Sequence, residues 1–391
     1  MREGWEYKKL GDVCQPKSNI ERATKCFSSS DRIEYVDISS IDNLTNKIIA
    51  STSYRMDEAP SRAQQKVCLG DIIISTVRPN LKNVAKVDKE MDNLVVSSGF
   101  CVLRTNDSVV DNYIYHYVSS DLFANHLMKL STGANYPAVR DKDVRDSVIP
   151  VPAKSTQLDI VAELDQINDL IRLKKELLKE YDNLAQSIFY DMFGDPVVNE
   201  KDWEVRKLCD VCTKITDGTH DTPKRLTSGV KFITGKHIRP FRIDYDNSDY
   251  VTEEVHREIY KRCNPEYGDV LYTNIGANFA IAAVNIVTYE FSMKNVALLK
   301  FDNDITGFYV QYVLNFESMH SKIVENFGKG GAQNFLSLKQ INSICIPLPS
   351  LPLQQEFSSR IEQIEKLKIE VQKTITDLET LLASRMQYWF E

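Results

Sequence analysis

The sequence predicts an α+β protein made of two similar mixed α/β domains, each followed by a long helix. The first observation is an internal repeat, because the opening around Trp5 returns around Trp203, displaced by 198 residues. The second is a Pro-rich joint in each half, Ile-Pro-Val-Pro at 149–152 and Ile-Pro-Leu-Pro at 346–349. The third is a helical pattern after each joint. A duplicated chain carries an approximate twofold axis, so we expect pseudo-twofold symmetry.

These features divide the chain into four segments. The globular domains are expected at 1–153 and 196–349, and the long helices at 154–195 and 350–391. The Gly-Asp pairs at 70–71 and 268–269 repeat at the opening's offset of 198, whereas the Pro-rich joints repeat at 197. A net slip of one residue over half the chain indicates a true duplication.

Composition describes an ordinary soluble protein. The chain has 391 residues, of which 42% are hydrophobic and 26% are charged, which is typical of globular domains. It has no apolar run of the roughly 18 residues that a membrane span needs, and the N-terminus lacks an apolar signal core. We therefore expect a cytoplasmic protein without a membrane partner. The eight cysteines are expected as reduced thiols, and Cys209 and Cys212 lack the second pair that a zinc site needs, so no metal is expected.

The net charge of −7 is unevenly distributed. The globular segments are near neutral, with 20 basic and 20 acidic residues in 1–153 and 18 and 19 in 196–349. The helical segments hold the excess acid. Within the second domain, 205–242 has nine Lys or Arg and three Asp or Glu. Such a basic stretch can supply phosphate contacts despite the overall charge.

Each helical segment has an apolar seam with spacings of mostly four and three residues, which is a heptad pattern. The two seams share one register at the 197-residue offset, although Lys368 stands where the first has Ile171. We expect the two helices to bury their seams against each other. The seam residues singled out for helix packing are Ile160, Leu164, Ile167, Ile171, Leu178, Phe357, Ile361, Ile364, Val371 and Ile375. A second apolar stripe leaves room for helices of a partner: Leu170, Leu173, Leu177, Leu184, Leu367 and Leu381.

The globular segments show strand patterns and longer helical ones. Strands are expected where β-branched runs follow a turn or alternate, at 71–77, 95–96, 100–103, 269–274 and 296–299. One helix per domain is expected, at 112–130 and at 307–326. A glycine-containing loop follows each helix, at 131–136 and 328–334.

Catalytic motifs are missing. Gly328-Lys329-Gly330-Gly331 lacks the spacing of a cofactor loop and follows a helix rather than a strand. Asn264-Pro265-Glu266-Tyr267 departs from the Asn-Pro-Pro-Tyr motif of amino-methyltransferases at Glu266, and a turn explains it better. The histidines have no zinc-ligand spacing, and there is no Gly-x-Ser-x-Gly elbow. We expect neither catalysis nor a cofactor.

This ordered set of motifs, present twice, resembles the specificity subunit of Type I restriction–modification enzymes over essentially the whole chain. The openings, the Gly-Asp strands, the Pro-rich joints and the helices that begin near Gln157 and Gln354 carry the resemblance. The segment Tyr190-Asp191-Met192-Phe193-Gly194-Asp195-Pro196 is also typical of the end of that family's central helix.

The resemblance implies a non-catalytic subunit with two target-recognition domains, each of which reads half of a split site in double-stranded DNA. The helices would lie antiparallel as a coiled coil, act as a ruler between the half-sites, and bind two methyltransferase subunits. Motor–nuclease subunits would join for cleavage. Two alternatives stay open: the specificity subunit of a related Type II system, and a free-standing DNA-binding regulator, against which the second apolar stripe counts.

The halves differ most where the family reads bases. Lys214–His220 has no counterpart around Pro16–Asn19, and 75–80 differs from 273–278. The two half-sites are therefore expected to differ.

Arg and Asn can bond to base edges, and Lys suits phosphates; for every candidate the alternative is an ordinary solvated loop side chain. Asp217 and His220 could simply hold their loop. The DNA-binding candidates are Arg78, Asn80, Lys82, Asn83, Asn135, Tyr136 and Arg140 in the first domain, and Lys214, Thr219, His220, Lys224, Lys236, Arg239, Asn274, Asn278, Lys329, Gln333 and Asn334 in the second.

Overall fold

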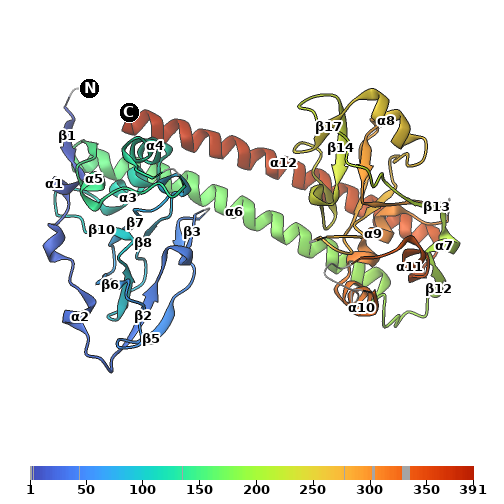
Figure 1. The fold of residues 1–391 in the computed structure, drawn as a ribbon, viewed down its shortest axis with the longest axis horizontal. Coiled ribbons are helices and arrows are strands. Elements are labelled where there is room, and N and C mark those ends of the chain that lie inside the picture. Colours follow the sequence, from blue (N-terminus) through green and yellow to red (C-terminus); the bar gives the residue numbers. More distant parts are fainter. Residues whose placement is uncertain are drawn as a thin grey trace. The chain divides into compact units, whose positions relative to one another are not determined.

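The computed structural model describes residues 2, 4–43, 45–133, 135–276, 278–301, 304–327 and 335–391. The chain forms two compact units: unit 1 comprises Met1–Lys175 and Lys373–Glu391, and unit 2 comprises Glu176–Gln372. The long helices α6 (Lys154–Phe193) and α12 (Leu351–Phe390) each contribute one half to each unit (Figure 1). A unit is thus a globular domain together with parts of both helices.

The described residues of unit 1 form four small sheets. A four-stranded sheet has the order β5-β2-β9-β6, a three-stranded sheet the order β10-β7-β8, and β1 pairs with β11 and β3 with β4. The strands are β1 (Glu6–Lys9), β2 (Arg32–Val36), β3 (Ile41–Asp42), β4 (Lys47–Ile48), β5 (Thr52–Arg55), β6 (Ala63–Lys66), β7 (Ile72–Ser75), β8 (Val84–Lys86), β9 (Leu94–Ser97), β10 (Phe100–Leu103) and β11 (Val148–Val151). Its shorter helices are α1 (Leu10–Val13), α2 (Ala23–Cys26), α3 (Asp111–Ser119), α4 (Asp121–Leu130) and α5 (Asp141–Arg145), with 3-10 turns η1 (Lys17–Asn19), η2 (Ile38–Ser40) and η3 (Pro79–Leu81).

Unit 2 repeats the plan with variations. Its sheets have the orders β13-β21-β18-β19, β17-β14-β20, β12-β22 and β15-β16. The strands are β12 (Glu204–Lys207), β13 (Cys212–Asp217), β14 (Val230–Thr234), β15 (Ile238–Arg239), β16 (Arg242–Ile243), β17 (Asp249–Val251), β18 (Val270–Tyr272), β19 (Ala282–Val284), β20 (Ser292–Lys294), β21 (Ala297–Phe301) and β22 (Cys345–Leu348). The shorter helices are α7 (Leu208–Val211), α8 (Glu253–Tyr260), α9 (Gly307–Asn315), α10 (Glu317–Phe327) and α11 (Leu338–Asn342), with the 3-10 turn η4 (Gly235–His237).

The expected strands are present, but the single helix expected in each domain is wrong in both. At 112–130 the structure has α3 and α4, because Ser120 adopts an extended conformation and its hydroxyl caps α4 by accepting a bond from Phe123 N. At 307–326 it has α9 and α10, with Phe316 extended between them. An extended residue between two helical patterns changes the chain direction without disturbing the apolar periodicity.

The Pro-rich joints prove to be strands. Each pairs antiparallel with the opening strand of its own half, so that Tyr7 faces Pro150 and Val205 faces Pro347. Proline is tolerated because each of these sheets has only two strands. One edge of every strand is therefore unpaired and needs no backbone N–H donor. The repeated openings and joints are therefore the two strands of one sheet.

The duplication extends to individual buried bonds. Gln157, at the start of α6, is fully buried; its Oε1 accepts from Val110 N at 2.9 Å and its Nε2 donates to Pro152 O at 2.9 Å. Gln354, in α12, is equally buried and bonds Thr306 N at 3.0 Å and Pro349 O at 2.8 Å. Each domain therefore holds the start of its own long helix through one glutamine.

Within each unit the two long helices run antiparallel. In unit 1, Glu163 pairs with Arg385, and Lys175 pairs with Glu379 at 2.8 Å. In unit 2, Lys368 lies 2.8 Å from Asp182, so the charged residue in the apolar seam has a carboxylate partner on the other helix. No described helix is long and apolar enough to cross a membrane.

The seam packs on the domains as well as between the helices. Ile160 and Leu164 belong to the core of the first domain, and Phe357, Ile361 and Ile364 to that of the second. Ile167, Ile171, Val371 and Ile375 are also buried, and Leu178 is half-buried. Burial of this seam fixes each domain onto the helix pair.

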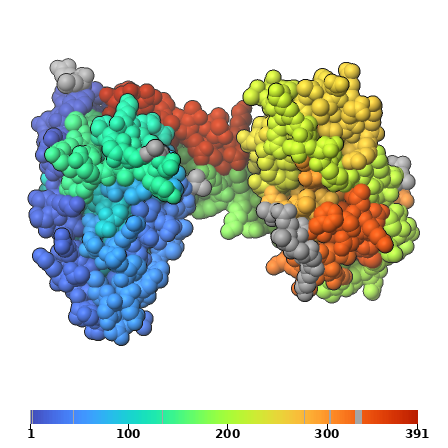
Figure 2. Space-filling view, in the orientation of Figure 1, coloured from blue at the N-terminus to red at the C-terminus, as the bar shows by residue number. Residues whose placement is uncertain are grey.

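The two ends of the chain meet in unit 1, where red and blue segments adjoin in Figure 2. The rings of Trp5 and Trp389 stack with centroids 6.3 Å apart, and the Arg2 guanidinium lies 4.8 Å from the Trp5 ring. Glu163 accepts a bond from Trp389 Nε1 at 2.9 Å in addition to its pairing with Arg385. This cluster of side chains holds the end of α12 on the first domain.

Candidate nucleic-acid interface

The turn after β7, residues 76–83, carries four of the candidates in the first domain. The strand β7 itself follows the Gly70-Asp71 pair. The Asp71 carboxylate accepts a hydrogen bond from Cys68 N at 2.8 Å and binds Arg104 through both of its oxygens. Asp71 is therefore not available to neutralise Arg78. We call residues 76–83 the β7 turn.

Within the β7 turn, the side chains differ in their freedom. Arg78 and Asn80 are exposed, whereas Lys82 and Asn83 are half-buried. Lys82 Nζ pairs with Asp121 at 2.8 Å, which ties the end of the turn to α4. Arg78 and Asn80 are the members best placed to reach a ligand.

The loop at 131–140 lies directly beside the β7 turn. Arg78 N donates to Pro137 O at 2.7 Å, and Val139 N donates to Thr76 O at 2.9 Å. Asn135 and Tyr136 are exposed at its tip, whereas Arg140 pairs with Asp143 at 2.9 Å. The structure thus brings together two segments that are about 60 residues apart and that the sequence had proposed separately.

The second domain builds the same junction from different residues. Leu336 N donates to Asn274 O at 2.8 Å, and Ile275 bridges to Phe335. Asn274 is buried, and its Oδ1 has no partner within the part of the chain that the structure describes. Asn278 uses its Nδ2 to hold η4, donating to Gly235 O at 3.0 Å and Ile238 O at 3.1 Å. These two asparagines shape the turn from inside and do not extend from it.

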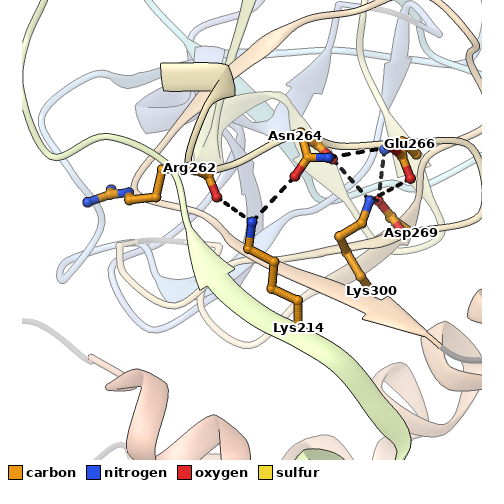
Figure 3. Close-up of polar contacts among 6 residues, drawn as sticks. All are labelled: Lys214, Arg262, Asn264, Glu266, Asp269 and Lys300. Carbon is orange, nitrogen blue, oxygen red and sulfur yellow. Dashed lines mark hydrogen bonds and ion pairs between the residues drawn. The ribbon is translucent and has the colours of Figure 1, made fainter. Parts of the chain in front are cut away.

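Lys214 lies in a network that supports the turn before β18 (Figure 3). Its Nζ donates to Arg262 O at 2.7 Å, beside Asn264. Lys300 completes the network by binding Glu266 at 2.9 Å and Asp269 at 2.6 Å. Burial raises the pKa of the Asp269 carboxyl, while the bond from Lys300 opposes that shift. The Asn264–Tyr267 segment is thus a structural turn, as the sequence predicted, and the Lys214 ammonium is engaged in it.

The loop after β13 is held by its own side chains. His220 Nε2 lies 2.8 Å from Asp217 Oδ2, and its Nδ1 lies 2.9 Å from Asn295 Oδ1. Thr219 is half-buried, and its hydroxyl accepts from Asp221 N at 3.1 Å. The alternative that Asp217 and His220 hold their loop fits these contacts, although the His220 ring remains exposed.

The basic stretch 205–242 is only partly free. Lys236 and Arg225 share Asp249, at 3.0 and 2.6 Å, and Arg239 donates to Lys236 O at 2.7 Å. Lys224, which directly precedes Arg225, is exposed. Arg225 was not among the candidates, although its position next to Lys224 in the basic stretch could have indicated it. The candidates Lys329, Gln333 and Asn334 lie outside the described residues.

One arrangement looks like a hydrolytic triad but is structural. His256 lies 3.0 Å from Ser292 Oγ and 3.0 Å from Glu290 Oε2. Ser292 is completely buried in β20, and His256 is buried as well. A nucleophile must reach its substrate, so this trio serves packing of α8 against the sheet.

Both cysteines of Cys209-x-x-Cys212 have a raised pKa. Burial raises the pKa of Cys212 to about 12, and the hydrogen bond from the Cys209 thiol to Asp210 raises the pKa of Cys209. Nucleophilic attack needs the thiolate, and a raised pKa disfavours that form.

The second apolar stripe lies largely on the surface. Leu170 and Leu173 of α6 and Leu381 of α12 are exposed in unit 1, and Leu184 and Leu367 are exposed in unit 2. Leu177 is half-buried. Leu170 and Leu184 return at the repeat offset as Leu367 and Leu381, so each unit has exposed leucines on both helices.

Comparisons with known proteins agree with this architecture. A model of the Type I restriction modification DNA specificity domain matches residues 2–181 and again 200–380. The MjaIX specificity subunit of a Type I restriction enzyme from Methanocaldococcus jannaschii is 23% identical over 96% of this chain and 90% of its own length. The EcoKI specificity subunit from Escherichia coli K12 is 20% identical over 81% of this chain and 72% of its own.

Solved structures are similar over the full length. A chain from a study of assembly and conformational transition in the type I R-M system has a TM-score of 0.62 and 26% identity, covering 99% of this chain and 97% of its own. The S subunit of a Type I restriction–modification system from M. genitalium has a TM-score of 0.58 at 14% identity, covering 99% of this chain and 96% of its own, which supports the fold.

Proposed function

The chain belongs to the Type I restriction modification DNA specificity family, and on that premise we propose that each domain reads one half of a split DNA site through the turn after its Gly-Asp strand. The protein is a non-catalytic recognition subunit whose partners are double-stranded DNA, methyltransferase subunits and motor–nuclease subunits. It works in the cytoplasm, where such partners meet DNA. No step of the chemistry falls to this chain.

A single observation carries the proposal: one scaffold presents different side chains in the two domains. The bond from Val139 N to Thr76 O in the first domain has an equivalent in the bond from Leu336 N to Asn274 O, at the start of the turn after β18 (the β18 turn). At the equivalent tips, the first domain exposes Arg78, whereas the second has Gly276. Phosphate contacts position a protein and base contacts specify the sequence, so a constant frame with variable tips suits two different half-sites.

The exposed leucines of the helix pair are the proposed docking points for the methyltransferase subunits. Each unit exposes at least one leucine on each of the two long helices, so one chain carries two similar sets of exposed leucines. Exposed apolar residues gathered on one element indicate an interface. Two similar surfaces fit two copies of one partner.

The test is reconstitution with the methyltransferase subunit of the same restriction–modification system. The complex should methylate a split sequence on genomic DNA, whereas the isolated chain with labelled S-adenosylmethionine should transfer no methyl group above background. Methyl transfer by the chain alone, or a complex that methylates without sequence preference, contradicts the proposal.

Phosphate contacts are tested on the same complex. Lys224→Ala should weaken binding on all sequences and lower the salt slope by about one. Lys214→Ala is the matched control, because its ammonium already donates to Arg262 O and to the Asn264 side chain, and it should leave the salt slope unchanged.

A further inference from the structure

The side chains of Arg78 and Tyr136 contact each other on the surface of the first domain. The Arg78 guanidinium carbon lies 4.5 Å from the centroid of the Tyr136 ring. Tyr136 is 67% exposed, and Arg78 is exposed beside it. No carboxylate of the described residues lies within ion-pairing distance of Arg78. Its guanidinium contacts the Tyr136 ring instead, and its charge remains free to bind a ligand.

The backbone under this pair is fixed on both sides. Arg78 N donates to Pro137 O at 2.7 Å, and Thr132 and Ala138 exchange two bonds of 3.0 Å. Gly133 allows the tight turn between them, since a Cβ there would lie 2.8 Å from Tyr136 O. The ring is therefore presented by a closed loop that is itself bonded to the β7 turn.

Arg78 occupies a backbone conformation that favours glycine. Its φ of 51° and ψ of 63° are left-handed, and Lys82 at the other end of η3 has φ 49°. Such conformations cost free energy for residues with a Cβ and gather at functional sites. The β7 turn keeps arginine there in spite of this cost.

The internal repeat supplies the comparison. Ser75 N donates to Asn83 O, and Thr273 N donates to Ile281 O, so the two turns align at an offset of 198. Arg78 then corresponds to Gly276, which has φ 98°. A Cβ at Gly276 would meet no atom of the described residues within 4 Å. The equivalent turn of the second domain has glycine at this position, so the turn does not need arginine for its own conformation.

We propose that Arg78 reads a guanine in the half-site of the first domain, and that Tyr136 is the positioning residue that orients it. An arginine whose face rests on an aromatic ring keeps its N–H edge directed outward in a fixed plane. That edge matches O6 and N7 of guanine in the major groove. The inference deepens the proposed function and rests on it.

The test uses the reconstituted methyltransferase complex and a library of all single-base variants of its target. Arg78→Gly is the informative variant, because glycine suits the left-handed conformation and leaves the turn unstrained. At one guanine of one half-site, the preference should fall from roughly 5- to 150-fold to near one. Preferences at all other positions should be unchanged, and the thermal midpoint should not fall.

Tyr136 is tested in parallel. Tyr136→Ala should weaken the preference at the same guanine only, and Tyr136→Phe, which keeps the ring, should restore it. Lys142→Ala is the matched control, because Lys142 is an exposed cation of α5, close in sequence to Tyr136 but not a DNA-binding candidate, and it should leave that preference intact.

The outcomes separate the two levels of the argument. If the wild-type complex has no split target, the proposed function fails. If it has one and Arg78→Gly retains every base preference, or weakens binding equally on all sequences as loss of a phosphate contact would, the assignment of Arg78 is wrong. If Arg78→Gly acts as expected but Tyr136→Ala changes nothing, the role of Tyr136 is wrong.

Discussion

Replacing Gln354 by methionine should loosen the second domain from α12. The side chain is fully buried, and Thr306 N and Pro349 O both depend on it. Methionine has similar volume but no polar group, so both backbone groups would be left buried and unpaired. Such a loss costs roughly 2–4 kcal/mol in total. For a domain of this size the thermal midpoint of unit 2 should fall by about 5–15 °C.

Hydrogen exchange followed by mass spectrometry locates the effect. Peptides around Thr306 and the start of α12 should exchange faster in Gln354→Met. Gln157→Met should instead affect peptides around Val110, where the equivalent bond lies. Gln363→Met is the control on the same helix, because Gln363 is exposed. If Gln354→Met unfolds like Gln363→Met, the buried glutamine does not join domain to helix.

Two further predictions concern the helices. The bond from Arg385, supported by Trp389, lowers the pKa of Glu163 below its ordinary 4.5. Its ionised form therefore stabilises unit 1 above pH 4.5, and that contribution is lost as the pH falls through the lower folded value. The difference in unfolding free energy between wild type and Glu163→Gln should shrink as the pH is lowered from 4.5; a difference that grows would refute this. Inserting four residues after both Glu176 and Lys373 adds about 6 Å to each helix. The favoured spacer should then lengthen by roughly two base pairs at 3.4 Å per step, and an unchanged spacer in an active complex would exclude a helical ruler.

Repetition made much of the fold predictable. Trp5 and Trp203, the Gly-Asp pairs and the Pro-rich joints recur at nearly constant offsets, so the two domains and both long helices follow from the sequence. The breaks at Ser120 and Phe316 could not be seen, because α3 with α4, and α9 with α10, keep an apolar periodicity across one extended residue.

The candidate site was less predictable, because exposure and pairing depend on distant segments. Lys214 and Asn278 have the residue types of DNA contacts, yet their polar groups are bonded to backbone carbonyls more than 35 residues away. The joining of Arg78 to Tyr136 depends on how the loop after α4 folds back onto β7. A left-handed arginine also leaves no trace in composition or spacing.

The most direct measurement of the central claim is a domain exchange read out on the methylated genome. Residues 15–140, which contain the β7 turn and its neighbouring loop but not the β1–β11 sheet or the long helices α6 and α12, are replaced by the equivalent part of a homologue. The account predicts that one half-site changes to that of the homologue, while the other half-site and the spacer persist. A change in both half-sites, or in neither, would contradict the claim that each domain reads its own half.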